Sequence, residues 1–174
     1  MRQIVVLKPN QTKIIELILD KNNQNKELYI FFVGRNIDQF ILSTISKHLK
    51  PNTISITIVR GVLFDQAQAK IDGMIEIGEK IKNCDAFLDQ KILLIGDHAH
   101  ADVRPQLEIK NNEVKASHAA SIGRVDKEQL FYLMSRGLDY DQATDELVRG
   151  FFQKVINNVK NLRLKSKLEK ELLA

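Results

Sequence analysis

The spacing of apolar residues changes once along the chain, near Val125, and this change limits what the chain can fold into. Before it, Ile and Val stand in short apolar or alternating runs separated by Gly, Asn, Asp and Pro, which is the pattern of β-strands. After it, apolar residues recur every three to four positions, as on one face of an α-helix. The sequence therefore predicts a mainly β part, residues 1–125, followed by a small α-helical part, residues 126–174.

The β part consists of many short runs at fairly even spacing, which is typical of a sandwich, a barrel or a solenoid. Similar triplets at Ile56–Ile58, Ile75–Ile77 and Ile92–Leu94 recur at nearly equal intervals, each close to one turn of a β-helix. No exact repeat decides among these architectures. The segment 36–49 stays ambiguous, because its apolar positions also fit a short amphipathic helix. The runs with the strand pattern are Ile4–Leu7, Leu28–Val33, Ile54–Val59, Met74–Ile77, Ile92–Ile95, Gln106–Ile109 and Val114–Ser117.

Three helices are predicted in the α part. Asp126 and Gln129 read as an N-cap with a capping-box partner, and Gly137 supplies the C-terminal stop of the first helix. Asp139 with Gln142 repeats the start signal for the second helix. The third helix is expected over residues 161–173. The expected apolar faces are Leu130, Leu133 and Met134 in the first helix, Ala143, Leu147, Phe151, Val155 and Val159 in the second, and Leu164, Leu168 and Leu172 in the third.

Composition narrows the class of protein further. A chain of 174 residues can bury a core without disulfides, and its single cysteine, Cys84, excludes an internal disulfide framework. A lone thiol fits a reducing compartment, so we expect a cytoplasmic protein. The 26 basic and 22 acidic residues give a formal net charge of +4, too mild for a nucleic-acid-binding surface. No apolar run approaches the ~20 residues of a membrane span, so neither nucleic acid nor membrane is an expected partner.

The histidines are the only concentrated chemistry in the sequence. His98 and His100 stand two apart, and on a strand their imidazoles would share one face and could hold zinc or iron. In a turn the same pair would simply be solvated. His118 follows His100 at nearly the interval that separates the triplets, so the two become neighbours if that interval is one turn of a β-helix. The alternative for His118 is a buried structural histidine bonded to a backbone carbonyl.

The remaining reactive side chain is Cys84. It stands among Lys80, Lys82 and Lys91, which would favour its thiolate, whereas the alternative is a small buried residue. No catalytic triad, CxxC, Walker loop or GxGxxG is present, which argues against an ATPase or a dinucleotide enzyme. The basic residues near the end of the chain form either a solvated helix face or a docking surface for an acidic partner; they are Lys160, Arg163, Lys165 and Lys167.

One stretch combines rare elements in a fixed order. Its residues are Pro105–Ile109, Glu113–Gly123, Asp126, Leu130–Leu138, Ala143, Leu147 and Gly150–Phe151. In order and spacing they resemble the C-terminal signature of the SufB/SufD family, scaffold components of the SUF iron-sulfur cluster assembly machine. That signature reads P-x-L-E-I, then V-x-C/A-S-H-G-A-T-x-G, then L-F-Y-L-x-S-R-G-I. Residues 58–95 resemble the preceding part of the family more loosely, and the chain is much shorter than the family's members.

The resemblance implies a right-handed parallel β-helix followed by a small helical domain, and a non-catalytic scaffold rather than an enzyme. Family members pair through their β-helices, and their C-terminal helices dock SufC, an ABC-type ATPase. The implied partners are therefore a SufC-like ATPase and either a SufB-like scaffold or a second copy in a homodimer. The docking residues carried over from the family are Phe131, Tyr132, Arg136, Gly137 and Phe151.

The resemblance also implies a transient iron-sulfur cluster, with His118 on the family's Ser-His position as a ligand and Cys84 as a second cluster-binding residue. Ala119 stands where the SufB branch has Glu and the SufD branch has Gly, so the likeness is nearer to SufD. The essential cysteine of the SufB branch lands on Gln90, six residues after Cys84. Three functions stay open: a scaffold that contributes a cluster ligand, an interaction subunit that coordinates nothing, and a metal-dependent enzyme built on the paired histidines.

Overall fold

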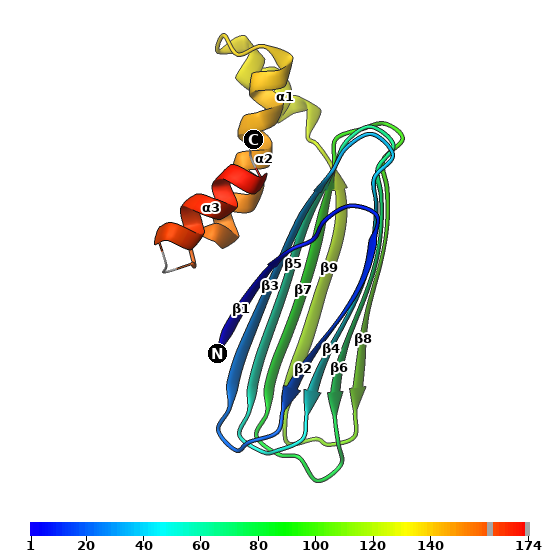
Figure 1. Cartoon of the computed structure of the whole chain (residues 1–174), viewed down its shortest axis with the longest axis vertical. Coiled ribbons are helices and arrows are strands. Elements are labelled where there is room, and N and C mark those ends of the chain that lie inside the picture. The colour runs from blue at the N-terminus through cyan, green and yellow to red at the C-terminus, as the bar shows by residue number, and fades with distance from the viewer. Residues whose placement is uncertain (160–161, 173–174) are drawn as a thin grey trace. The chain divides into compact units, whose positions relative to one another are not determined.

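The chain folds into two units, the first formed by Met1–Gly123 and the second beginning at Arg124. The computed structural model describes residues 1–159 and 162–172. The first unit is a parallel β-solenoid of about four coils, and the second consists of helices (Figure 1). The expected order of a β-helix followed by a helical part is therefore confirmed.

The solenoid is built from two parallel sheets that face each other. In Figure 1 the odd-numbered strands point one way and the even-numbered strands point the other way, so the chain crosses between sheets after every strand. The first sheet contains β1 (Arg2–Val6), β3 (Asn25–Gly34), β5 (Ile54–Leu63), β7 (Asp85–Leu94) and β9 (Lys115–Arg124). The second contains β2 (Gln11–Leu19), β4 (Gln39–His48), β6 (Gln68–Ile77) and β8 (His100–Ile109).

One coil of the solenoid contains two strands and the two corners that follow them. Asn25 pairs with Ile54 in the first sheet, and Gln68 of the other sheet pairs with His100. Partners on stacked corners stand 29 to 32 positions apart in the sequence. The sequence predicted that one turn of the β-helix is about as long as the interval between the triplets, and this was wrong. The triplets lie on β5, β6 and β7, so their spacing measures the step from one sheet to the opposite one. The ambiguous segment 36–49 is a strand, β4, and not a helix.

Inward-facing side chains fill the space between the sheets. Phe32 and Phe40 are fully buried and stack with their ring centroids 4.7 Å apart. Gly61 makes room for this pair, since a Cβ atom at this position would lie 2.2 Å from the Phe32 ring. The main apolar cluster consists of Ile15, Leu17, Leu28, Ile30, Phe32, Phe40, Leu42, Val59, Leu63, Ala67, Ala69, Ile71, Ile92, Leu94, Ala99 and Ala101.

The corners of the solenoid are formed by residues in the left-handed backbone region. Asn and Asp adopt this region more readily than other non-glycine residues. At one corner the backbone amide of Asn52 donates to the carbonyl of Lys82 at 3.1 Å, and that of Asn83 donates to the carbonyl of Glu113 at 2.8 Å. Successive coils therefore stack through their corners as well as through their strands. The left-handed residues of the solenoid are Asn10, Asn23, Asn36, Asn52, Asp65 and Asn83.

The second unit contains α1 (Lys127–Ser135), α2 (Tyr140–Ile156) and α3 (Leu162–Leu172). Asp126 caps α1 by accepting a hydrogen bond from the Glu128 amide at 2.9 Å. Asp139 and Gln142 form the predicted capping box at the start of α2. Gly137, at a φ of 99°, follows the end of α1 and ends the helix as predicted.

The buried faces of the helices differ in detail from the prediction. In α2 the buried large side chains include Val148 and Phe152, whereas Leu147 and Phe151 are only half-buried. In α3, Leu168 and Leu172 are buried and Leu164 is half-buried. The predicted helix ends at 161 and 173, and the basic residue at 160, lie outside the described residues. Over the described part of the chain, no helix combines the length and the apolar character needed to cross a membrane.

Candidate functional site

His118 lies on β9, the last strand of the five-stranded sheet. The amide of Lys115 donates to the carbonyl of Cys84 at 2.8 Å. With the same bond pattern as elsewhere in this sheet, Lys115 lies beside Asp85 and His118 beside Leu88. Leu88 is buried in the interior, and paired residues of parallel strands share a face. His118 is nevertheless exposed, because it faces the interior side at the open end of the solenoid.

Cys84 does not meet His118 within one chain. It precedes β7, four residues before Leu88, and is 2% exposed. At ~3.3 Å per residue, four residues along a strand span about 13 Å, whereas ligands of one cluster must surround the same few atoms. Gln90, the position of the SufB-branch cysteine, is fully buried in the middle of β7. The corner that holds Cys84 would have to shift by six residues to bring the thiol there.

Cys84 belongs instead to a polar network at one corner of the solenoid. Its Sγ lies 3.2 Å from the Thr53 hydroxyl, which in turn lies 2.7 Å from Nδ1 of His48. Nε2 of His48 lies 2.9 Å from the Ser55 hydroxyl. Burial lowers the pKa of His48 to about 4, so the imidazole is neutral at physiological pH. The network joins successive coils. Sequence reasoning missed His48, because the Thr and Ser residues at alternating positions near it look like residues of a solvent-exposed face.

The lysines expected around Cys84 have other partners or are not in contact with it. Lys82 pairs its ammonium with Glu113 at 2.7 Å, and Lys91 lies 3.9 Å from Asp89. The hydrogen-bond partners of the thiol are the Thr53 hydroxyl and two backbone carbonyls. The arrangement matches the alternative of a small buried residue.

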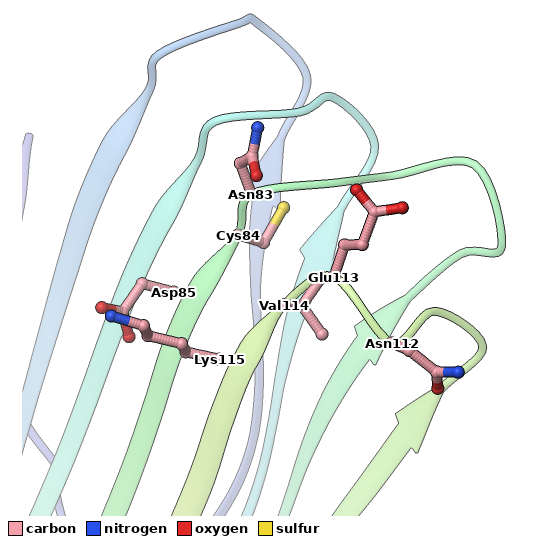
Figure 2. A pocket seen from close by; sticks show the side chains of 7 residues that line it. All are labelled: Asn83, Cys84, Asp85, Asn112, Glu113, Val114 and Lys115. Atoms are coloured by element: carbon pink, nitrogen blue, oxygen red, sulfur yellow. The ribbon is translucent and has the colours of Figure 1, made fainter.

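A pocket of ≈540 Å³ opens beside this corner. Figure 2 shows Asp85 and Lys115 on one face of their strands, with Cys84 and Val114 turned to the other face. The pocket lies where the last two coils meet, and its lining includes the carboxylates of Asp85 and Glu113 and the ammonium of Lys115. It is lined by Asn83, Cys84, Asp85, Asn112, Glu113, Val114 and Lys115.

The paired histidines lie apart from the other candidate ligands in the part of the chain that the structure describes. His98 lies in the turn before β8, and His100 is the first residue of β8; both are exposed. The condition under which His100 and His118 become neighbours is not met, because a full coil is much longer than the interval between them and they lie in opposite sheets. Within residues 1–159 and 162–172, no group of three His, Cys, Asp or Glu side chains is placed to hold a metal ion.

The helical residues singled out by the sequence lie mostly on the surface. Phe131 is 73% and Tyr132 56% exposed, and both belong to α1. The Arg136 guanidinium lies over the Tyr132 ring, 5.1 Å from its centroid, and donates to the Tyr132 hydroxyl at 3.3 Å. Phe151 is half-buried and packs edge-to-face on Phe152 at 5.5 Å. Exposed aromatic rings beside an arginine are typical of protein-binding surfaces.

The two strands at the end of the solenoid differ in what their outer edges can bind. The amides of His100, the first residue of β8, and of Lys110, which follows its last residue, donate to carbonyls at the two ends of β6. Backbone nitrogens alternate in direction along a strand, so those of odd-numbered residues, including Pro105, face the outer edge. A proline there removes a donor and blocks an added strand. On β9 the odd-numbered Lys115 bonds to β7, so the even-numbered residues, His118 among them, present their backbone groups at an edge without proline. Sequence reasoning missed this role of Pro105.

In sequence, the chain is similar to proteins of the SufBD family. A family model described as "SUF system FeS cluster assembly, SufBD core domain" matches residues 3–151. The chain is 30% identical over 142 residues to an iron-sulfur cluster assembly SufBD family protein of Synechocystis, covering 82% of this chain and 30% of that protein. It is 29% identical over 149 residues to SufD of Escherichia coli, covering 84% and 35%. It is 31% identical over 106 residues to SufB of Bacillus subtilis, covering 61% and 23%. The chain therefore spans about a third or less of the length of these relatives.

Proposed function

Since the chain belongs to the SufBD core domain family of the SUF iron-sulfur cluster assembly system, we propose that it is a scaffold component of such a system. In this role it pairs with a second scaffold chain and docks a SufC-like ABC-type ATPase through its C-terminal helices. The observation that carries the proposal is the family match over residues 3–151, which covers the solenoid, α1 and most of α2.

Pairing takes place along the outer edge of β9. This edge supports an added strand, because its backbone groups are not interrupted by proline and its side chains are mostly small. Ala120→Pro removes one outward amide, so we expect it to abolish pairing with a second copy or a SufB-like chain. Leu107→Pro is the matched control, because it makes the same change on the edge of β8 that Pro105 already interrupts. Light scattering after gel filtration measures the assembly, and a paired Ala120→Pro protein would contradict this role of β9.

Docking of the ATPase uses the exposed rings of α1 and the arginine beside them. Phe131 and Tyr132 offer apolar area, and Arg136 offers a planar, permanently charged group held over a ring. We expect Phe131→Ala and Arg136→Glu each to weaken binding of a SufC-like ATPase by at least about tenfold in calorimetry. Lys127→Ala, on the same helix, is the control and should bind as the parent does. Equal affinity for all three variants would remove this helix from the docking surface.

His118 contributes a cluster ligand only together with donors from the paired chain. Its position on the pairing edge supports this role, and the distance of about 13 Å from Cys84 along the strand argues against a site within one chain. Anaerobic reconstitution of the paired complex with iron and sulfide should give a chromophore that His118→Ala loses and Cys84→Ser keeps.

A chromophore that persists in His118→Ala would favour the second function, an interaction subunit that coordinates nothing. The observation that favours this alternative is the lack of any three-ligand group among the described residues. Iron analysis of the purified complex separates the two functions, because only the first retains iron that depends on His118.

A further inference from the structure

The interior of the solenoid has a polar side that the scaffold role does not use. On β4 the inward polar side chains are Thr44, Ser46 and His48, and on β5, across the interior, they include Ser55 and Thr57. Each hydroxyl near the corner finds a partner in the opposite sheet: His48 lies 2.9 Å from Ser55, and Ser46 lies 3.1 Å from Thr57. Polar groups therefore pair in register across the solenoid, starting from the corner.

This pairing stops at Thr44. The strands of the two sheets run in opposite directions (Figure 1). Continuing the pairs His48–Ser55 and Ser46–Thr57 by one step places Val59, the next inward residue of β5, opposite Thr44. Val59 offers no hydrogen-bonding atom, and Thr44 Oγ1, which is buried, has no hydrogen-bond partner among the described residues.

Gln90 brings a second set of orphaned atoms to the same place. It lies beside Val59 in the sheet, is fully buried, and neither its amide nitrogen nor its amide oxygen has a hydrogen-bond partner in the described chain. Its side chain crosses the interior to Gly73, where a Cβ atom would lie 2.5 Å from Nε2. Gly73 pairs with Thr44 on the neighbouring strand.

The spacing of these groups suits a bridging molecule. Neighbouring strands lie about 4.8 Å apart, which is too far for a direct hydrogen bond between Thr44 and an amide over Gly73, but close to the separation of two groups bridged by water. Buried polar groups are rarely left unpaired, and ordered water is their usual partner when the protein supplies none. The orphaned groups themselves, the Thr44 hydroxyl and the Gln90 amide, are uncharged, which favours water over an ion.

We propose that a buried hydration site lies between β4, β6 and β7, where water bridges the Thr44 hydroxyl and the side-chain amide of Gln90. The water extends the polar side of the interior by one step beyond Ser46 and Thr57. It explains why a glutamine rather than an apolar residue occupies the middle of β7.

A crystal structure sharp enough to show ordered water tests the proposal directly. We expect a density peak within hydrogen-bond distance of both Thr44 Oγ1 and an amide atom of Gln90, and loss of that contact in Thr44→Val. Thr57→Val is the matched control, because it removes an interior hydroxyl that already has a protein partner and should leave the peak in place. A Gln90 amide bonded directly to protein atoms, with no peak, overturns the proposal.

A solution measurement covers the case in which the variants do not crystallise or fold. In the unmodified chain, the side-chain amide protons of Gln90 should show cross-relaxation with a slowly exchanging water in NMR spectra. If the side-chain amide protons of Gln90 show no cross-relaxation with water, the proposal is also overturned.

Discussion

Lowering the pH from 7 to 4.5 should destabilise the solenoid through one residue, His48. The imidazole is 1% exposed, and its two nitrogens lie within hydrogen-bond distance of the hydroxyls of Thr53 and Ser55. Burial lowers its pKa from 6.5 to about 4. The unfolded chain therefore takes up a proton near pH 6.5, whereas the folded chain does so only near pH 4.

The sign and size of the effect follow from that difference. Between these two pH values the unfolded state binds more protons, so the stability due to His48 is fully present above about pH 7 and is lost as the pH falls toward 4. The full shift corresponds to roughly 3 kcal/mol. Only part of the two titrations falls between pH 7 and 4.5, so we expect about 2 kcal/mol over this range.

Urea unfolding of the parent and of His48→Gln at both pH values measures the effect. Glutamine can still hydrogen-bond to the two hydroxyls but does not titrate. Between pH 7 and 4.5 the His48→Gln variant should therefore lose about 2 kcal/mol less unfolding free energy than the parent. His98→Gln removes an exposed histidine and should lose as much stability as the parent. If the parent and His48→Gln lose the same free energy of unfolding, the imidazole is not held neutral and the reasoning is wrong.

Three further substitutions test the packing and the caps. Gly61→Ala places a Cβ atom against the Phe32 ring and should lower the free energy of unfolding by about 1–3 kcal/mol in urea titrations. Gly123→Ala, also in a strand but with no atom within 4 Å of the added group, should change it by less than about 0.5 kcal/mol. Asp139→Ala removes the capping box of α2 and should destabilise the helical unit by about 1 kcal/mol, seen as a lower Tm by circular dichroism.

The order of the two parts, a β-helix followed by helices, could be predicted from the sequence. The number of residues in one coil of the β-helix could not. Short apolar runs and capping signals such as that of Asp139 are local, so they identify strands and helices directly. The pairing of Ile54 with Asn25 joins residues in different coils, and no local pattern distinguishes a step to the opposite sheet from a full turn. Strand β4 stayed ambiguous because its inward positions from Thr44 to His48 are polar, which hides the alternation that marks a half-buried strand.

The sequence could nominate candidate site residues, but it could not predict how they are arranged. The Ser-His element pointed to His118, which lies on the edge strand. The separation of Cys84 from His118 depends on the register between β7 and β9, and the blocking role of Pro105 depends on which of its neighbours bond to β6. Register is a property of paired strands, so a single strand's sequence carries little of it.

The coil-on-coil stacking described above has a mechanical consequence. Each coil bonds only to the coil before and the coil after it, so the solenoid is close to one-dimensional in its contacts. A force applied at the two ends of this unit should peel coils away one at a time rather than rupture all strands together. Each event would release one coil, or roughly 100 Å of extended chain at ~3.3–3.6 Å per residue. The force trace would then count the coils directly.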